Sequence, residues 1–141
     1  MNLVEINNQT RSKVDLVLIK QVCKKFLALS KLKNKEVSLA LVDDKEIRKL
    51  NKLYRGLSNI TDVLAFDGED NFLGEVIIDY AQIKRQARQI GSSTKQELTF
   101  VLVHGLLHLL GYEDKTKKAR VEMDKLTRRF MSKLKNHRND V

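Results

Sequence analysis

Residues 96–110 read QELTFVLVHGLLHLL, and this stretch decides the fold of the chain. Apolar residues fill most of its second half, so we expect a strongly apolar helix that needs other elements packed around it. Thr94 and Glu97 have capping-box spacing at its start, and Gly111 stands where a glycine commonly ends a helix. These signals predict where the helix begins and where it ends.

Strands and helices alternate along the rest of the chain. Apolar and β-branched runs predict strands over residues 2–7, 37–42, 61–67 and 72–80. We expect the last two strands to form a hairpin. Helical periodicity predicts helices over residues 13–31, 44–54, 81–90 and 116–134. Asp43 and Glu46 have capping-box spacing before the second of these helices. This order predicts an α/β (α+β) fold in which a small, mixed, four-stranded sheet packs against helices.

Length and composition restrict the class of protein. The chain has 141 residues, of which 42% are hydrophobic, so we expect one domain over residues 1–141 with a real core. No apolar run approaches the length of a membrane-spanning helix, and the first residues lack the pattern of a signal peptide. We therefore expect a cytoplasmic protein without a membrane partner. The single cysteine, Cys23, lies in an apolar helical pattern, which predicts core packing.

Basic residues outnumber acidic ones, with 27 Lys and Arg against 18 Asp and Glu and a formal net charge of +9. Such a balance favours a polyanionic partner such as RNA, DNA or an anionic lipid. The excess is concentrated between Lys115 and Arg138, at helical spacings. A solvated helix face and a surface that follows a phosphate backbone both fit this pattern, and charge alone does not separate them.

His104 and His108 have the spacing of a metal-binding pair. Four residues in a helix place both imidazoles on one face, close enough to hold one ion. Surface or hydrogen-bonded core histidines can show the same spacing, so the pair alone does not establish a site. Gly105 lies between them, where glycine costs about 1 kcal/mol relative to alanine. Its presence predicts a close approach of backbone or ligand.

A third ligand is available just after this helix. If Gly111 lets the chain turn back, Glu113 or Asp114 could complete a site that leaves a fourth position to water. Metal-assisted hydrolysis of a phosphoryl or carbonyl bond would follow. A helical zinc peptidase would carry glutamate after the first histidine, where this chain has Gly105, and the positive charge does not favour a peptidase either.

Three stretches resemble the YbeY family of bacterial rRNA maturation factors. HGLLHLLGYED at 104–114 resembles the family pattern H-G-x-L-H-L-x-G-Y-D-H, and LNKLYRGLSNITDVLAF at 50–66 resembles L-N-x-x-Y-R-x-x-x-x-P-T-D-V-L-S-F. LGEVIID at 73–79 is similar to the strand that follows in the family. The resemblance covers most of the chain, although the first 35 residues match only in pattern.

The resemblance implies a metal-dependent, single-strand-specific endoribonuclease that acts in rRNA maturation, at the 3′ end of 16S rRNA, and in ribosome quality control. It implies that His104 and His108 bind zinc, that His104 is also catalytic, and that Arg55 is the functional arginine. The planar guanidinium of Arg55 suits a phosphate because it donates two hydrogen bonds to the oxygens. The implied partners are single-stranded RNA, rRNA and ribosomal particles, with no small-molecule cofactor.

Asp114 stands where the family has its third histidine. The pair at Glu122 and Met123 matches a later family landmark without a gap, so we interpret the substitution as real. A carboxylate is a competent zinc ligand, but its negative charge suits a harder divalent ion better. Asp114 could instead cap the final helix. The alternative function is therefore a ribosome-associated RNA-binding protein with a weakened or lost metal site.

Overall fold

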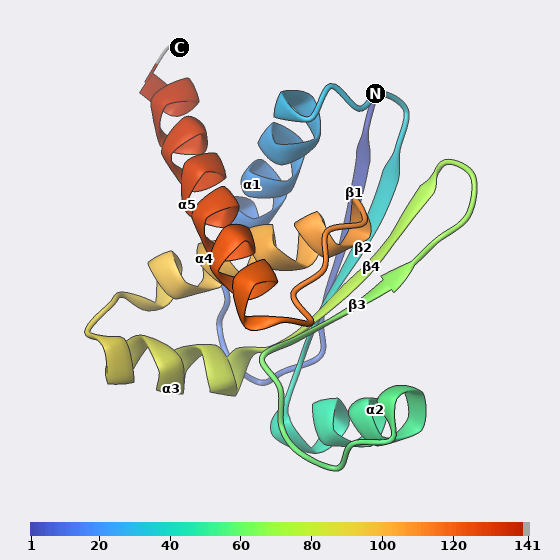
Figure 1. Ribbon diagram of the computed structural model, residues 1–141, viewed down its shortest axis with the longest axis vertical. Helices are drawn as coiled ribbons and strands as arrows, with labels where there is room; N and C mark the ends of the chain where they lie inside the picture. Colours follow the sequence, from blue (N-terminus) through green and yellow to red (C-terminus); the bar gives the residue numbers. More distant parts are fainter. Residues whose placement is uncertain (140–141) are drawn as a thin grey trace.

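The computed structural model describes residues 1–139, with side chains through residue 135. Its elements, labelled in Figure 1, are β1 (Leu3–Asn8), α1 (Leu16–Leu29), β2 (Glu36–Val42), α2 (Asp44–Arg55), β3 (Val63–Asp67), β4 (Phe72–Asp79), α3 (Tyr80–Ile90), α4 (Thr94–Leu109) and α5 (Lys117–Asn139). The predicted order of elements is confirmed. The first helix is shorter than the predicted 13–31 because the Asp15 side chain accepts from the Leu18 N–H and caps its start.

The four strands form one mixed sheet in the order β1-β2-β4-β3. The β1–β2 and β2–β4 pairs are parallel, and β3 pairs with β4 as the predicted antiparallel hairpin. The predicted α/β fold is therefore confirmed, with the histidine-bearing helix α4 in the C-terminal half. β3 lies at one edge of the sheet, so among the described residues it pairs with another strand, β4, along one edge only.

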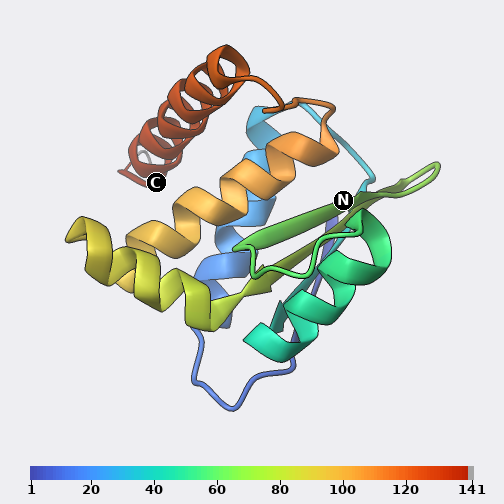
Figure 2. The ribbon, with the colours of Figure 1, turned by 60° about the horizontal axis from the view of Figure 1, so that its bottom comes forward.

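Helices cover the two faces of the sheet unequally, as Figure 2 shows. The smaller core lies under α2, and its buried residues are Ala40, Val42, Ile47, Leu64 and Ile77. The larger core lies on the opposite face, where α1, α4 and α5 pack together. Cys23 is fully buried in this larger core, as predicted, and burial raises the pKa of its thiol. No helix in the described part of the chain is long and apolar enough to cross a bilayer.

Gly105 brings α4 directly onto the sheet. A Cβ atom at this position would lie 2.7 Å from Cγ1 of Val76 and 3.2 Å from Cγ2 of Val63, closer than the packed side chains allow. The predicted close approach is therefore that of a helix to β3 and β4. It fixes the neighbouring His104 beside the edge strand β3.

The predicted capping box of α4 is wrong by one residue. Ser93, not Thr94, is the N-cap: its hydroxyl accepts from the Gln96 N–H at 3.1 Å, and the Gln96 side chain accepts from the Ser93 N–H. Glu97 takes no part because it is buried and accepts a 2.7 Å hydrogen bond from Nε2 of Gln86 on α3. The Glu97 carboxylate, which the local spacing assigned to the helix cap, is therefore used in a contact between α3 and α4.

The end of α4 agrees with its prediction. Gly111 has φ +98°, its N–H donates to the carbonyl of His108, and the Tyr112 N–H donates to the carbonyl of Leu107. These two bonds form a Schellman motif, which requires a residue with positive φ at this position. The chain therefore turns back over the last turn of α4.

Asp79 has a buried carboxyl group at the start of α3. It is 0% exposed, and Oδ1 accepts from the Gln82 N–H at 3.3 Å as the N-cap. Burial raises the pKa of Asp79 to about 7, and the nearby carboxylate of Asp44 adds to the shift. Asp44 itself is held ionised by two hydrogen bonds from Arg85, which lower its pKa to about 2.

We expect the raised pKa of Asp79 to make the protein less stable as the pH rises. Between pH of about 4 and about 7 the folded protein holds a proton that the unfolded chain has released, so this contribution to the free energy of unfolding is lost by pH of about 7. Asp79→Asn keeps an acceptor at the cap but cannot titrate. Urea unfolding of both proteins across this range measures the effect, and curves with equal pH dependence would contradict it.

Candidate metal centre

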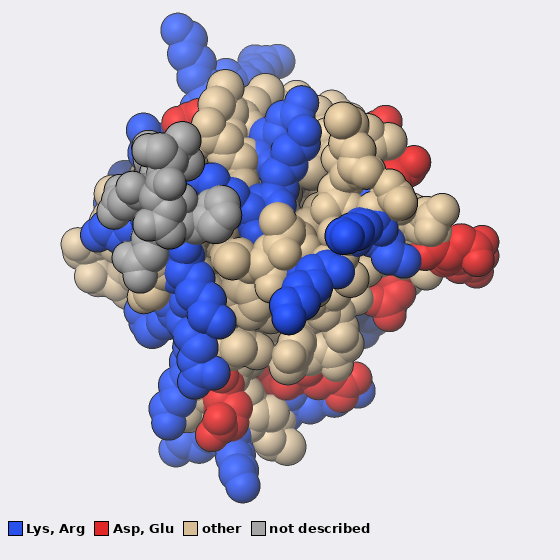
Figure 3. Space-filling view, turned by 90° about the horizontal axis from the view of Figure 1, so that it is seen from above, with Lys and Arg blue, Asp and Glu red and all other residues tan. Residues whose placement is uncertain are grey.

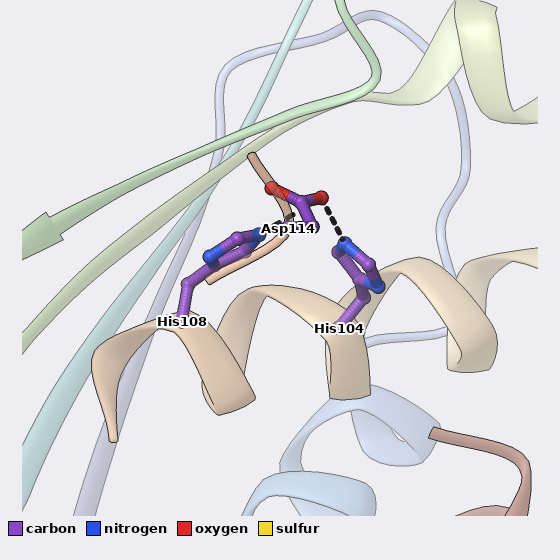
Figure 4. Close-up of side chains that lie close together, drawn as sticks. All are labelled: His104, His108 and Asp114. Atoms are coloured by element: carbon purple, nitrogen blue, oxygen red, sulfur yellow. Dashed lines mark hydrogen bonds and ion pairs between the residues drawn. The ribbon is translucent and has the colours of Figure 1, made fainter. Parts of the chain in front are cut away.

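Three side chains converge beside α4, as Figure 4 shows. His104 and His108 come from the helix and Asp114 from the segment after it, and their ligand atoms all lie within 4.8 Å of one another. Oδ2 of Asp114 lies 3.1 Å from Nε2 of His104 and 3.6 Å from Nε2 of His108. The side chains are 15%, 26% and 34% exposed for His104, His108 and Asp114, so the cluster is partly shielded yet open to solvent.

The turn after α4 sets the tautomer of His108. Nδ1 of His108 lies 3.0 Å from the backbone carbonyl oxygen of Tyr112. Because a carbonyl can only accept, Nδ1 carries the proton and Nε2 presents its lone pair toward Asp114. A metal ion between this ring nitrogen and the carboxylate oxygen would be bound by both.

His104 is the third donor, and its ring lies in a different environment from that of His108. Its Nε2 faces Asp114, whereas its Nδ1 is buried and has no hydrogen-bond partner in the described part of the chain. Phe100 stacks against its ring at a centroid distance of 6.1 Å, and the ring of His108 lies 4.9 Å away. Two imidazole nitrogens and a carboxylate oxygen are a donor set typical of zinc and of other divalent ions. The residues present therefore fit a divalent metal ion.

Burial keeps His108 in the neutral form that metals bind. It lowers the pKa of His108, and the charges of His104 and Arg55 lower it further, against the opposing influence of Asp114 and the Tyr112 carbonyl. A histidine must be deprotonated at its ligand nitrogen to hold a metal. The neutral imidazole of His108 therefore has a nitrogen lone pair available to a metal ion.

Arg55 is the last residue of α2, and Gly56 ends the helix with φ +69°. Although α2 packs on the opposite face of the sheet from α4, the charge of Arg55 reaches His108 and contributes to its lowered pKa. The Arg55 side chain is exposed and forms no salt bridge with another residue whose side chain is described. Its guanidinium is thus accessible to an anionic ligand.

α5 carries many exposed basic residues, one of which, Arg128, lies near the candidate metal centre. These residues, the basic surface of α5, are Lys117, Lys118, Arg120, Lys125, Arg128, Arg129, Lys133 and Lys135. Figure 3 shows Lys and Arg side chains spread over the upper end of the molecule. The guanidinium of Arg128 lies 5.1 Å from the ring centroid of Phe100, the residue that stacks on His104. The side chain of Arg138, the end of the predicted basic run, lies outside the described residues.

The structure brings His104, His108 and Asp114 together, whereas Arg55 makes no described contact with them and is related to them only by the influence of its charge on His108. Glu113, the other candidate for the third ligand, points elsewhere: it is 66% exposed and pairs with Lys115 at 3.6 Å. Asp114 does not cap α5, because Thr116 does so by accepting from the Ala119 N–H. The sequence interpretation missed Phe100, although its position four residues before His104 puts it on the same helix face.

Comparisons with known proteins identify the family of this chain. The model of a family described as Endoribonuclease YbeY matches residues 5–135. The Endoribonuclease YbeY of Sulfurihydrogenibium sp. (strain YO3AOP1) is 38% identical over 122 residues, which are 82% of this chain and 80% of that protein. Its namesake in Thermoanaerobacter sp. (strain X514) is 33% identical over 95% of this chain and 98% of its own. A Thermotoga maritima protein of known solution structure is similar with a TM-score of 0.63 and 25% identity, over 98% of this chain and 95% of that one.

Proposed function

The chain belongs to the YbeY endoribonuclease family, and from this membership we propose that it is a metal-dependent, single-strand-specific endoribonuclease of rRNA maturation. The family makes it a hydrolase that acts on RNA. The observation that supports the rest of the proposal is the convergence of His104, His108 and Asp114 on one point, with the charge of Arg55 close by.

We assign the three converging residues to a zinc ion, with another divalent metal as the alternative. When bound, such an ion polarises a phosphoryl oxygen and activates a water molecule near neutral pH. His104 and His108 supply neutral nitrogens, and the hydrogen bond from His108 to the Tyr112 carbonyl holds that imidazole in orientation. Asp114 supplies the one negative charge among the three ligands.

Arg55 and α5 have separate tasks in the proposed reaction. Arg55 binds the scissile phosphate and stabilises the charge that grows on its oxygens in the transition state. The basic surface of α5 contacts the phosphates that flank it, without regard to sequence, because Lys and Arg there face solvent. We propose that His104 binds the metal and also lies at the reacting phosphate, so we assign it a catalytic role.

We propose that the substrate is the 3′ end of 16S rRNA within ribosomal particles in the cytoplasm, and that the same activity serves ribosome quality control. The net charge of +9 supports a large polyanionic partner of this kind. The prediction that residues 1–141 form a single YbeY-like domain remains a prediction.

A cleavage assay on two matched substrates tests the proposal. Labelled single-stranded RNA and its duplex are incubated with zinc-loaded protein, with chelator-treated protein and with chelator-treated protein given zinc again. We expect cleavage of the single strand only, lost on chelation and restored by the metal. Binding should weaken steeply with salt because Lys and Arg contacts release counterions.

One outcome would favour the alternative function. If single-stranded RNA binds with this salt dependence but no divalent ion supports cleavage, the protein is an RNA-binding member of the family with a weakened site. Cleavage of the duplex at the same rate would instead contradict the strand specificity.

A further inference from the structure

Two tyrosine rings are exposed on segments that carry residues of the proposed site. Tyr54 is 62% exposed and directly precedes Arg55, and Tyr112 is 48% exposed in the turn whose carbonyl holds His108. An exposed aromatic ring offers a flat apolar face on which another molecule can stack. The third tyrosine, Tyr80, is 9% exposed and belongs to the larger core.

We infer that Tyr54 and Tyr112 are stacking surfaces for two unpaired bases of the RNA strand whose phosphate lies at Arg55. The inference rests on the proposed function and assigns its strand specificity to named residues. Neither ring belongs to the metal site or binds the phosphate.

The need for such surfaces follows from what the other residues can recognise. A metal ion, Arg55 and the lysines of α5 all contact phosphates, and a duplex presents phosphates as well as a single strand does. Only a single strand offers the faces of its bases, because those of a duplex are stacked on each other. Discrimination between the two therefore requires groups that contact base faces, and aromatic rings do so.

Contacts order both tyrosines before any strand binds, Tyr54 through its ring and Tyr112 through its backbone. The Tyr54 ring packs against Phe66 of β3 at a centroid distance of 5.0 Å and an angle of 59°, which leaves its other side to solvent. Tyr112 follows Gly111 in the Schellman turn, where its own N–H bonds to the Leu107 carbonyl. A ring that is already ordered loses little entropy when a base stacks on it, so more of the contact contributes to affinity.

The neighbourhood of Tyr54 favours a nucleic acid over a protein partner. Leu53 and Leu57 are also exposed there, at 68% and 46%, but the exposed side chain of Arg55 lies between them in sequence, at the end of α2. A charge at the centre of an apolar protein interface would have to be desolvated. A nucleotide, in contrast, pairs that charge with its phosphate and covers the ring with its base.

The intrinsic fluorescence of the chain provides a direct test. The sequence has no tryptophan and three tyrosines, so tyrosine emission reports on Tyr54 and Tyr112 together with the buried Tyr80. Metal-free protein in chelator is titrated with a single-stranded oligouridylate and with an RNA duplex, which separates binding from cleavage. We expect the single strand to quench the emission and the duplex to leave it largely unchanged.

Variants then assign the effect to each ring. Tyr54→Leu and Tyr112→Leu should each raise the Kd for the oligouridylate by about fivefold to about a hundredfold, the range of one lost base stack. Tyr54→Phe and Tyr112→Phe should keep the parent affinity, because a phenyl ring also stacks. Leu53→Ala is the matched control, since Leu53 is equally exposed on the same turn but not aromatic. In cleavage assays the Leu variants should raise KM and leave kcat unchanged.

Each result distinguishes this inference from the proposed function. If the Leu variants bind the single strand as tightly as the parent does, or if Leu53→Ala weakens binding equally, stacking on these rings is wrong while the nuclease proposal stands. If the parent binds and the variants behave as expected but no metal supports cleavage, the nuclease proposal is wrong and the stacking surfaces stand. A parent that binds no RNA would contradict both.

Discussion

His104→Ala is expected to lose bound metal and RNA cleavage together. The change removes one of three converging donors and leaves His108 and Asp114, which are too few to hold a divalent ion tightly. Loss of an outer hydrogen-bond partner alone can cost about 10-fold to 100-fold in affinity or activity, so loss of a ligand should cost more than about a hundredfold. Metal analysis after dialysis, with cleavage of labelled single-stranded RNA, measures both effects.

The fold should survive this substitution, which keeps the test clear. The His104 side chain is partly exposed, and its buried Nδ1 makes no hydrogen bond with any described residue, so few stabilising contacts disappear. Circular dichroism and the melting temperature of the metal-free proteins provide the control. A His104→Ala variant that still cleaves RNA at the parent rate would place the active site elsewhere.

Substitutions of Asp114 provide a graded comparison at the same site. Asp114→Ala should weaken zinc binding, whereas Asp114→His should strengthen it, because imidazole is a favoured zinc ligand and the turn at Gly111 already directs this position at the two histidines. Thr116 caps α5, so neither change removes the cap of that helix. Equal zinc affinities for all three proteins would remove Asp114 from the metal site.

Local sequence signals predicted the parts of the site that depend on local geometry. The spacing of His104 and His108 follows from the helical period, and the return of the chain toward them follows from the glycine at position 111. The capping box failed for a reason that spacing cannot reveal. Glu97 has a partner on α3, Gln86, and a contact between two helices is not encoded in the residues next to either of them.

The position of Arg55 shows the same limit of local signals. It lies on a helix that packs against the opposite face of the sheet from α4, so neither periodicity nor spacing relates it to His108. Only the resemblance of residues 50–66 to a family motif predicted its role. The structure adds one relation that the sequence does not contain, because the charge of Arg55 at the end of α2 contributes to the lowered pKa of His108.

Arg55→Ala is expected to reduce RNA cleavage by about a hundredfold, since removing one donor to the transition state costs about 3 kcal/mol. The loss should appear in kcat, because the charge on the phosphate grows as the reaction proceeds. Metal content and melting temperature should stay at their parent values, because Arg55 is exposed, supplies no metal ligand and pairs with no described acidic side chain. Single-turnover cleavage of labelled single-stranded RNA measures the effect.

Two further variants test whether the effect requires the guanidinium group, only its positive charge, or any basic residue at this end of α2. Arg55→Lys keeps the charge but loses the planar fork that donates two hydrogen bonds to a phosphate, so it should restore only part of the rate. Lys52→Ala removes another exposed basic residue from the last turn of the same helix and should leave kcat unchanged. If Arg55→Ala cleaves as fast as Lys52→Ala, Arg55 has no chemical role, and its positive charge contributes only to the affinity for RNA.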